Sequence, residues 1–315
     1  MAYAIGEAAT IFDLIEAMDN LLQSVDWVRE EVRYTIYNGT PRINYCYWRG
    51  IGDGNDNIYL QAWIPEMRGG HVNYSDMIFD SSAGYDNKLY WWEQPGSLQQ
   101  WHKKYEDDDG TLNEVVLPMF TISPESRYYY WLFADSYHIA GVARMSIVYE
   151  SFYLGFLNPI ANERQYPYPM YIAGNSYATG ASWPSNDAGS FIFPNNGSGW
   201  LRRADGVWRA FAATHPNPSP TSTGTVFPYT AANQKLIPNY REQDAIEQNN
   251  FLLIPVMLQM ADPVDIAGLL RNVYWVSGTR DIDAEKILVI DNEQYIVFDR
   301  KQDRLPNSYF CIKLE

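Results

Sequence analysis

Cysteine and histidine are scarce in this sequence. Of 315 residues, two are cysteine and four are histidine. Two cysteines so far apart, Cys46 and Cys311, do not resemble the framework of a disulfide-rich secreted protein, so we expect buried thiols, with a disulfide between them as the alternative. The histidines show none of the spacings of zinc motifs, and they are His71, His102, His138 and His215. The sequence therefore predicts no metal site and no cofactor.

Long apolar runs and basic clusters are missing as well. No apolar stretch approaches the roughly 20 residues needed to span a bilayer, and residues 1–20 lack the basic flank and continuous apolar core of a signal peptide. The formal net charge is −15, with no basic run to bind nucleic-acid phosphates. We therefore expect no membrane insertion, no direct nucleic-acid binding, and folding in a reducing cytoplasm.

Aromatic residues are abundant instead. The chain holds 25 Tyr, 13 Phe and 11 Trp, and these residue types favour strands and gain most from burial in cores and interfaces. With 18 Pro and 21 Gly, the composition indicates a β-rich protein with many turns. The densest aromatic stretch, residues 128–157, is split at residues 134–136 and then alternates between two faces, so we expect it to form a central hairpin.

One helix is predicted, over residues 8–25. Apolar residues recur there every three or four positions, and Thr10 with Asp13 is a candidate capping box. From Glu31 the period changes to two, and Asn38-Gly39 is a strong hairpin signal, so a meander of three antiparallel strands is expected to follow. Near the C-terminus, residues 286–290 and 294–298 are expected to pair across a turn.

The predicted fold class is β-rich α+β. An N-terminal amphipathic helix, residues 1–30, leads into antiparallel sheets or a barrel or sandwich formed by residues 31–157 and 256–315. Residues 158–255 contain eleven prolines and only short apolar pieces. They are expected to form a long insertion rich in Pro, Gly and aromatic residues, with one continuous domain as the alternative.

No catalytic residue is predicted. Residues 174–178, GNSYA, approach the nucleophile-elbow pattern, but the last glycine is Ala178 and no helical pattern follows. Asp53, Asn55 and Asn57 match the first positions of a calcium loop, whose twelfth position is here an isoleucine. A carbohydrate-active enzyme that uses carboxylates such as Asp135 or Glu150 is kept as the alternative from another functional class.

Several segments together resemble structural proteins of tailed-bacteriophage virions. They are residues 153–159 (YLGFLNP), 165–174 (QYPYPMYIAG), 201–209 (LRRADGVWR), 273–278 (VYWVSG) and 309–314 (YFCIKL). The resemblance covers most of the chain, and its motifs are packing and turn patterns. It implies a non-enzymatic component of the neck, tail or baseplate, located in the virion and in the host cytoplasm during assembly.

The expected function is therefore assembly into a symmetric ring, expected to be hexameric, as in a tail-completion or collar protein. The partners implied are copies of the chain itself and other proteins of the neck, tail tube, sheath or baseplate. A baseplate or tail-tip component that contacts fibres or host glycans is the alternative. The predicted interface residues lie where the central hairpin meets the proline-rich segment, and they are Phe152, Tyr153, Phe156, Tyr166, Pro167, Tyr168 and Pro169.

Overall fold

The computed structural model shows a β-rich protein built from antiparallel sheets and one short helix. The structure describes residues 1–53, 56–64, 76–90, 93–98, 117–121, 127–160, 168–176, 190–192, 194, 198–203, 205–211, 224–229, 252–261, 264–276, 282–299 and 309–314. In this part of the chain the helix is α1 (Ile11–Ser24), and the strands form three sheets.

The central sheet contains seven strands. Their order is β1 (Ala2–Ala8), β7 (Tyr128–Ala134), β8 (His138–Met145), β9 (Val148–Phe156), β10 (Met170–Ala173), β12 (Gly199–Arg202) and β13 (Trp208–Ala210). The helix-side sheet has six strands, in the order β11 (Asn175–Ser176), β6 (Pro118–Thr121), β5 (Asp76–Ser82), β4 (Asp56–Trp63), β3 (Thr40–Asp53) and β2 (Val28–Tyr37). The C-terminal sheet has the order β14 (Gly224–Phe227), β15 (Leu253–Ala261), β16 (Val264–Val276), β19 (Tyr309–Lys313), β18 (Glu293–Asp299) and β17 (Ile287–Ile290).

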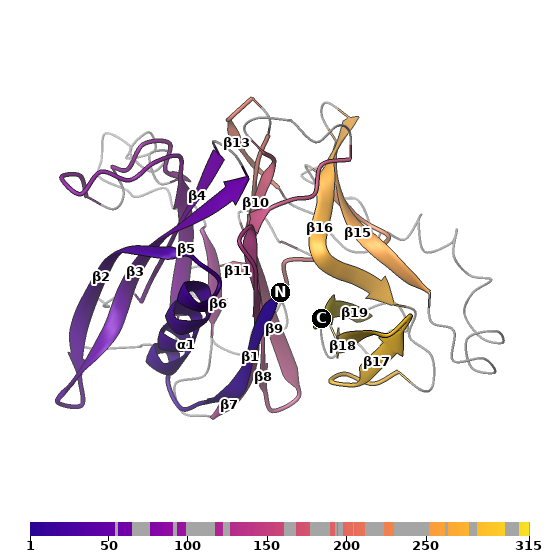
Figure 1. Cartoon of the computed structure of the whole chain (residues 1–315), viewed down its shortest axis with the longest axis horizontal. Helices are drawn as coiled ribbons and strands as arrows, with labels where there is room; N and C mark the ends of the chain where they lie inside the picture. Colours follow the sequence, from indigo (N-terminus) through magenta and orange to yellow (C-terminus); the bar gives the residue numbers. More distant parts are fainter. Residues whose placement is uncertain are drawn as a thin grey trace, which may run out of the picture.

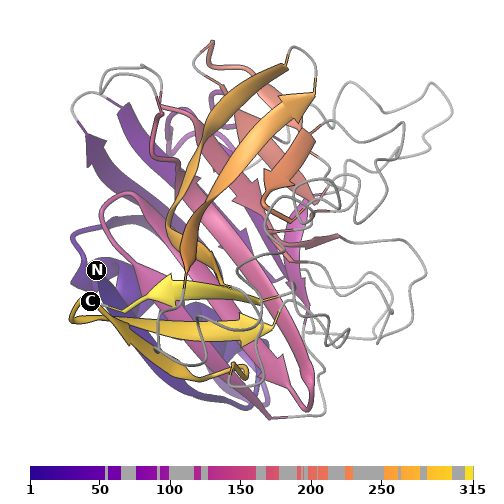
Figure 2. The same ribbon diagram turned by 90° about the vertical axis from the view of Figure 1, so that its right-hand side faces the viewer.

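The three sheets form layers, with the central sheet in the middle. Figure 1 shows the helix-side sheet and α1 on one face of the central sheet and the C-terminal sheet on the other. In Figure 2 the C-terminal strands cross those of the central sheet obliquely. Each interlayer space holds its own core: one lies under α1 and the helix-side sheet, and the other lies under the C-terminal sheet.

Burial on both faces explains why residues 128–157 are so aromatic and so poor in charge. Side chains of strands β7 to β9 alternate between the two cores: Leu132 and Phe152 belong to the helix-side core, and Trp131 and Tyr153 to the opposite one. Aromatic pairs join the layers, since Phe152 lies 4.8 Å from Phe79 and Trp131 lies 5.4 Å from Phe298, measured between ring centroids. A strand buried on both faces needs apolar residues at every position.

This stretch is a three-stranded meander and not the predicted hairpin. The first turn lies at residues 135–137, as expected, but a second turn separates β8 from β9. Ser146 has φ +58° in that turn. The prediction was wrong at this point because serine and isoleucine carry little turn signal, whereas the apolar alternation continues through them.

The N-terminal region begins with a strand that was not predicted. β1 precedes α1 and pairs antiparallel with β7. The helix starts after Thr10, whose side chain accepts a hydrogen bond from the Asp13 backbone, and Asp13 completes the capping box. The apolar side of α1, including Ile11, Ile15 and Met18, is fully buried. Residues 1–30 therefore contain a strand and a helix.

Several turns and both thiols agree with the sequence predictions. Asn38 and Gly39 join β2 to β3 with φ of +48° and +77°, and Asp291 and Asn292, also left-handed, join β17 to β18. Cys46 and Cys311 are buried and free, so the alternative of a disulfide is wrong. Burial raises the pKa of both thiols.

The described parts of residues 158–255 contribute to the sheets. β10, β12 and β13 extend the central sheet, β11 pairs with β6, and β14 pairs with β15. Prolines lie between these strands rather than within them. In its described parts the segment is thus integrated in all three sheets, and it is not a loop set apart from them.

Candidate functional site

Five of the seven predicted interface residues lie inside the protein. Phe152, Tyr153 and Phe156 are fully buried, and Tyr168 and Pro169 are buried beside them. Tyr166 and Pro167 are outside the described residues. In the described part of the signature, residues 153–159 and 168–174, these side chains are therefore explained by core packing in this chain. In this fold those five side chains offer a partner no surface, and a contact surface has to be sought elsewhere.

A buried ion pair joins the central sheet to the helix-side sheet. Arg202 on β12 is 4% exposed, and its Nη2 lies 3.0 Å from Oδ2 of Asp56 on β4. The same carboxylate oxygen accepts the backbone N–H of Tyr168 at 2.6 Å, and Arg202 donates to the Tyr168 carbonyl at 3.2 Å. The guanidinium also lies over the rings of Phe156 and Trp208. Burial lowers the pKa of Arg202, against the opposing effect of Asp56.

A second polar cluster joins the central sheet to the C-terminal sheet. Asp135 follows β7, and its Oδ1 accepts hydrogen bonds from the Tyr137 and His138 backbones and lies 2.9 Å from His138 Nδ1. Oδ2 accepts from Asn272 on β16 at 3.3 Å. Burial raises the pKa of Asp135, but the His138 ring and the backbone donors outweigh it, and the pKa falls to about 2.

His138 itself is a core residue. It is fully buried and stacks on Tyr153 with ring centroids 5.2 Å apart. Its Nε2 has no hydrogen-bond partner. The other three histidines are outside the described residues, and within the described residues no group of three His, Cys, Asp or Glu side chains is arranged to hold a metal ion.

The third cluster lies on the outer face of the helix-side sheet. Asp80 on β5 is fully buried, and its carboxylate accepts four hydrogen bonds, from Gln61 Nε2, Ser97 Oγ and the backbones of Ser81 and Leu98, at 2.6–3.2 Å. Burial raises the pKa of Asp80 to about 7, although these donors oppose the shift. The cluster holds residues 97–98 against the sheet.

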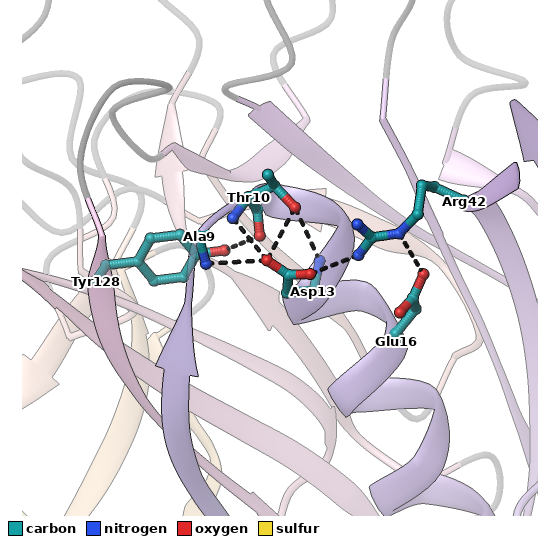
Figure 3. A network of polar contacts seen from close by, with 6 residues as sticks. All are labelled: Ala9, Thr10, Asp13, Glu16, Arg42 and Tyr128. Carbon is teal, nitrogen blue, oxygen red and sulfur yellow. Dashed lines mark hydrogen bonds and ion pairs between the residues drawn. The ribbon is translucent and has the colours of Figure 1, made fainter. Parts of the chain in front are cut away.

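The network in Figure 3 fixes the junction of β1 and α1. Asp13 Oδ2 accepts the backbone N–H groups of Ala9 and Thr10, and Asp13 Oδ1 pairs with Arg42 of β3, which also contacts Glu16 at 2.8 Å. The Tyr128 hydroxyl donates to the Thr10 carbonyl. Burial raises the pKa of Asp13, but the hydrogen bonds from Arg42 and Thr10 outweigh it and hold the pKa below its usual range.

The two carboxylates named for the alternative enzyme are far apart. Glu150 lies five residues along β9 from Gly155, which is the cross-strand partner of His138. Five residues of strand span about 16 Å, and Asp135 lies beyond His138. Catalytic carboxylate pairs of glycosidases are roughly 5–9.5 Å apart. Asp135 and Glu150 therefore cannot act as such a pair in this fold, and Glu150 instead accepts a hydrogen bond from Asn175.

Three pairs of exposed apolar side chains lie on strands at the margins of the sheets. They are Tyr3 and Ile5 on β1, Tyr34 and Ile36 on β2, and Ile287 and Val289 on β17. Each of these strands has a hydrogen-bonded neighbour on one side only among the described strands. Apolar side chains beside unpaired strand edges are a typical setting for protein–protein contact. These margins are the candidate functional surface.

Sequence reasoning missed β1 and the three polar clusters. For β1 a signal is visible, because small and large residues alternate through AYAIG in residues 2–6. For Arg202, Asp56 and Asp80 no local pattern exists, since their partners are distant in sequence.

Comparison of the chain with known protein families and with curated proteins finds no match. Within the described residues, no helix combines the length and apolar character needed to cross a membrane.

Proposed function

We propose that this chain is a non-enzymatic structural protein of a tailed-bacteriophage particle. It assembles with copies of itself into a symmetric ring, expected to be hexameric, in the neck or tail, and the ring contacts other proteins of the neck, tail tube, sheath or baseplate. The virion setting rests on the sequence resemblance of residues 153–174, 201–209, 273–278 and 309–314. The assembly role rests on the structure.

The observation that supports assembly is the exposure of apolar side chains on sheet-edge strands. In a monomer such side chains reduce solubility, and an unpaired edge is a template for pairing with another chain. The formal charge of −15 keeps unassembled copies apart in solution and disfavours binding to nucleic acid. Contact between copies then depends on short-range apolar interactions at the sheet edges.

The interior supports the same role. Two ion pairs join the layers: the buried pair of Arg202 and Asp56 joins the central and helix-side sheets, and the half-buried pair of Arg144 and Glu285 joins the central sheet to the C-terminal region. Such links hold three sheets in a fixed arrangement, which suits a protein that transmits load and keeps its interfaces in register.

The test is detection of the chain in purified particles. We expect peptides of this protein in particles separated from free protein by density gradient, and an antibody label at the neck or tail in electron micrographs. A label at the distal end would support the baseplate alternative. The purified protein should form a ring in negative stain. A protein that is absent from particles and monomeric with the tail components refutes the proposal.

A further inference from the structure

β1 is the least protected edge in the described part of the structure. It pairs with β7 in an uninterrupted antiparallel register, from Ala2 opposite Ala134 to Ala8 opposite Tyr128. No described strand lies on its other side. From Ala2 to Gly6 it contains no charge and no proline. Its backbone therefore offers a straight row of hydrogen-bonding groups to another strand.

The other sheet edges carry the features that block strand pairing. β11, β13, β14 and β17 have two, three, four and four residues, and Pro228 follows β14. β2 is long, but two irregularities interrupt its register, and its first half holds Arg29, Glu30, Glu31 and Arg33. Shortness, bulges and charges are the usual protections of an edge. β1 has seven residues, an uninterrupted register and no charge before Glu7, so it is the least protected of these six edges.

We propose that β1 pairs antiparallel with β1 of a second copy of this chain, around a twofold axis at Ala4. The sequence is self-complementary in this register. Tyr3 lies opposite Ile5 of the second copy, and Ala2 lies opposite Gly6, so that large side chains meet on one face and small ones on the other. Tyr3 and Ile5 are 44% and 53% exposed in the single chain, and aromatic–aliphatic cross-strand pairs are stabilising.

A second copy fits this edge better than another edge of the same chain. The described alternatives are too short, bulged or charged to match a regular seven-residue strand whose first five residues are uncharged. Electrostatics agrees, because the contact brings no like charges together: Glu7 lies at one end of β1, 3.8 Å from Arg127 of its own chain. Two molecules with a formal charge of −15 each can approach most closely where the local surface is uncharged.

This inference deepens the assembly part of the proposed function and names its contact. A twofold contact uses the same surface on both chains. A ring that contains it has an even number of chains and twofold axes perpendicular to its main axis. A hexamer of this kind combines threefold and twofold symmetry, with the two central sheets of each pair continuous across β1.

The first experiment changes the exposed face of β1. Ile5→Lys places a charge at the centre of the contact, and Ile147→Lys makes a similar change in the turn between β8 and β9, away from the sheet edges, where the side chain is 66% exposed. By light scattering we expect a wild-type mass that is an even multiple of the 36.3 kDa chain. Ile5→Lys should halve it or reduce it to the monomer, and Ile147→Lys should leave it unchanged. Because lysine makes the net charge less negative, loss of assembly cannot come from greater overall repulsion.

The second experiment tests the register, and it holds even if the lysine variant fails to fold. Ala4→Cys brings two thiols opposite each other, with Cα atoms about 4.5–5.5 Å apart, which is within disulfide range. Ala2→Cys is the matched control, because the two substituted positions lie about 13 Å apart along the paired strands. Mild oxidation should cross-link the first variant and not the second. Cys46 and Cys311 are buried and give no background.

The outcomes separate this contact from the virion proposal. A monomeric wild type, an unchanged mass for Ile5→Lys, or equal cross-linking of the two cysteine variants overturns the β1 contact. The protein could still be found in particles in each of these cases. Conversely, a β1-dependent oligomer that is absent from particles keeps the contact and refutes the virion role.

Discussion

The buried pair of Arg202 and Asp56 permits the sharpest test of how the layers are held together. Arg202→Met keeps much of the side-chain volume and removes the charge. Among the described residues, Asp56 is then left with the Tyr168 N–H as its hydrogen-bond donor, at 2.6 Å, in a site where its side chain is 12% exposed. Removing one partner of a buried pair costs about 3–5 kcal/mol, because the remaining charge stays desolvated without compensation.

The expected change in melting temperature follows from chain length. Unfolding entropy is roughly 2 cal/mol/K per residue, so for 315 residues each kcal/mol corresponds to about 1.5 °C. Arg202→Met should therefore lower Tm by roughly 5–8 °C in a calorimetric scan. A second variant, Arg202→Met with Asp56→Leu, removes both charges and should recover most of the loss, as replacement of whole buried pairs by apolar residues often does.

Arg209 provides the matched control. It pairs with Asp205 at 2.7 Å on the neighbouring strand β13, but both side chains are about two-fifths exposed. Exposed pairs contribute about 0–1 kcal/mol, so Arg209→Met should lower Tm by no more than about 1.5 °C. Equal effects of the two methionine variants, or a double variant as unstable as Arg202→Met alone, would refute the assignment of Arg202 and Asp56 as a coupled buried pair.

Three further predictions follow from other residues. The pKa of Asp80, raised to about 7, lies above its unfolded value, so its contribution to stability is present below about pH 4 and is lost as pH rises through 7. Measured by urea denaturation, the free energy of unfolding of the wild type should therefore fall by a few kcal/mol over this window relative to that of Asp80→Asn. Thr10→Ala removes the N-cap of α1 and should cost about 1 kcal/mol by the same assay, whereas Ser24→Ala at its other end should cost less. Gly155→Ala should destabilise the protein by several kcal/mol, because φ is +149° and the new Cβ would lie 2.4 Å from His138 Cβ. Gly39→Ala is the control, because that glycine has open space around it, and it should cost about 1 kcal/mol.

Local features of this fold were visible in the sequence. The helix period, the Thr10–Asp13 cap and the Asn38-Gly39 turn depend on residues within a few positions of each other, so a short window contains the whole signal. The same holds for the β17–β18 turn at Asp291 and Asn292. The β-rich class followed from the aromatic load, since these residues occupy strands that are buried on one or both faces.

Long-range features could not be read in this way. Arg202 and Asp56 are 146 residues apart, and nothing near either one identifies the other. Burial of the central sheet on both faces depends on two further sheets, of which one comes from the end of the chain. For the same reason the aromatic residues at 152–169 resembled a contact surface: composition indicates that such residues are covered, but it does not distinguish cover by the same chain from cover by a partner.

The position of β1 links the internal networks to assembly. Its C-terminal end leads directly into the Thr10–Asp13 cap, where Asp13 accepts the N–H groups of Ala9 and Thr10 and is itself held by Arg42 of the helix-side sheet. The Tyr128 hydroxyl fastens the Thr10 carbonyl to β7. A strand held in this way is already extended before it meets a partner, so pairing requires little ordering of its backbone. Because little conformational entropy is lost on pairing, most of the interaction between Tyr3 and Ile5 contributes to the binding free energy. An edge strand that is uncharged from Ala2 to Gly6 is thus held in place beside the N-terminal turn of α1.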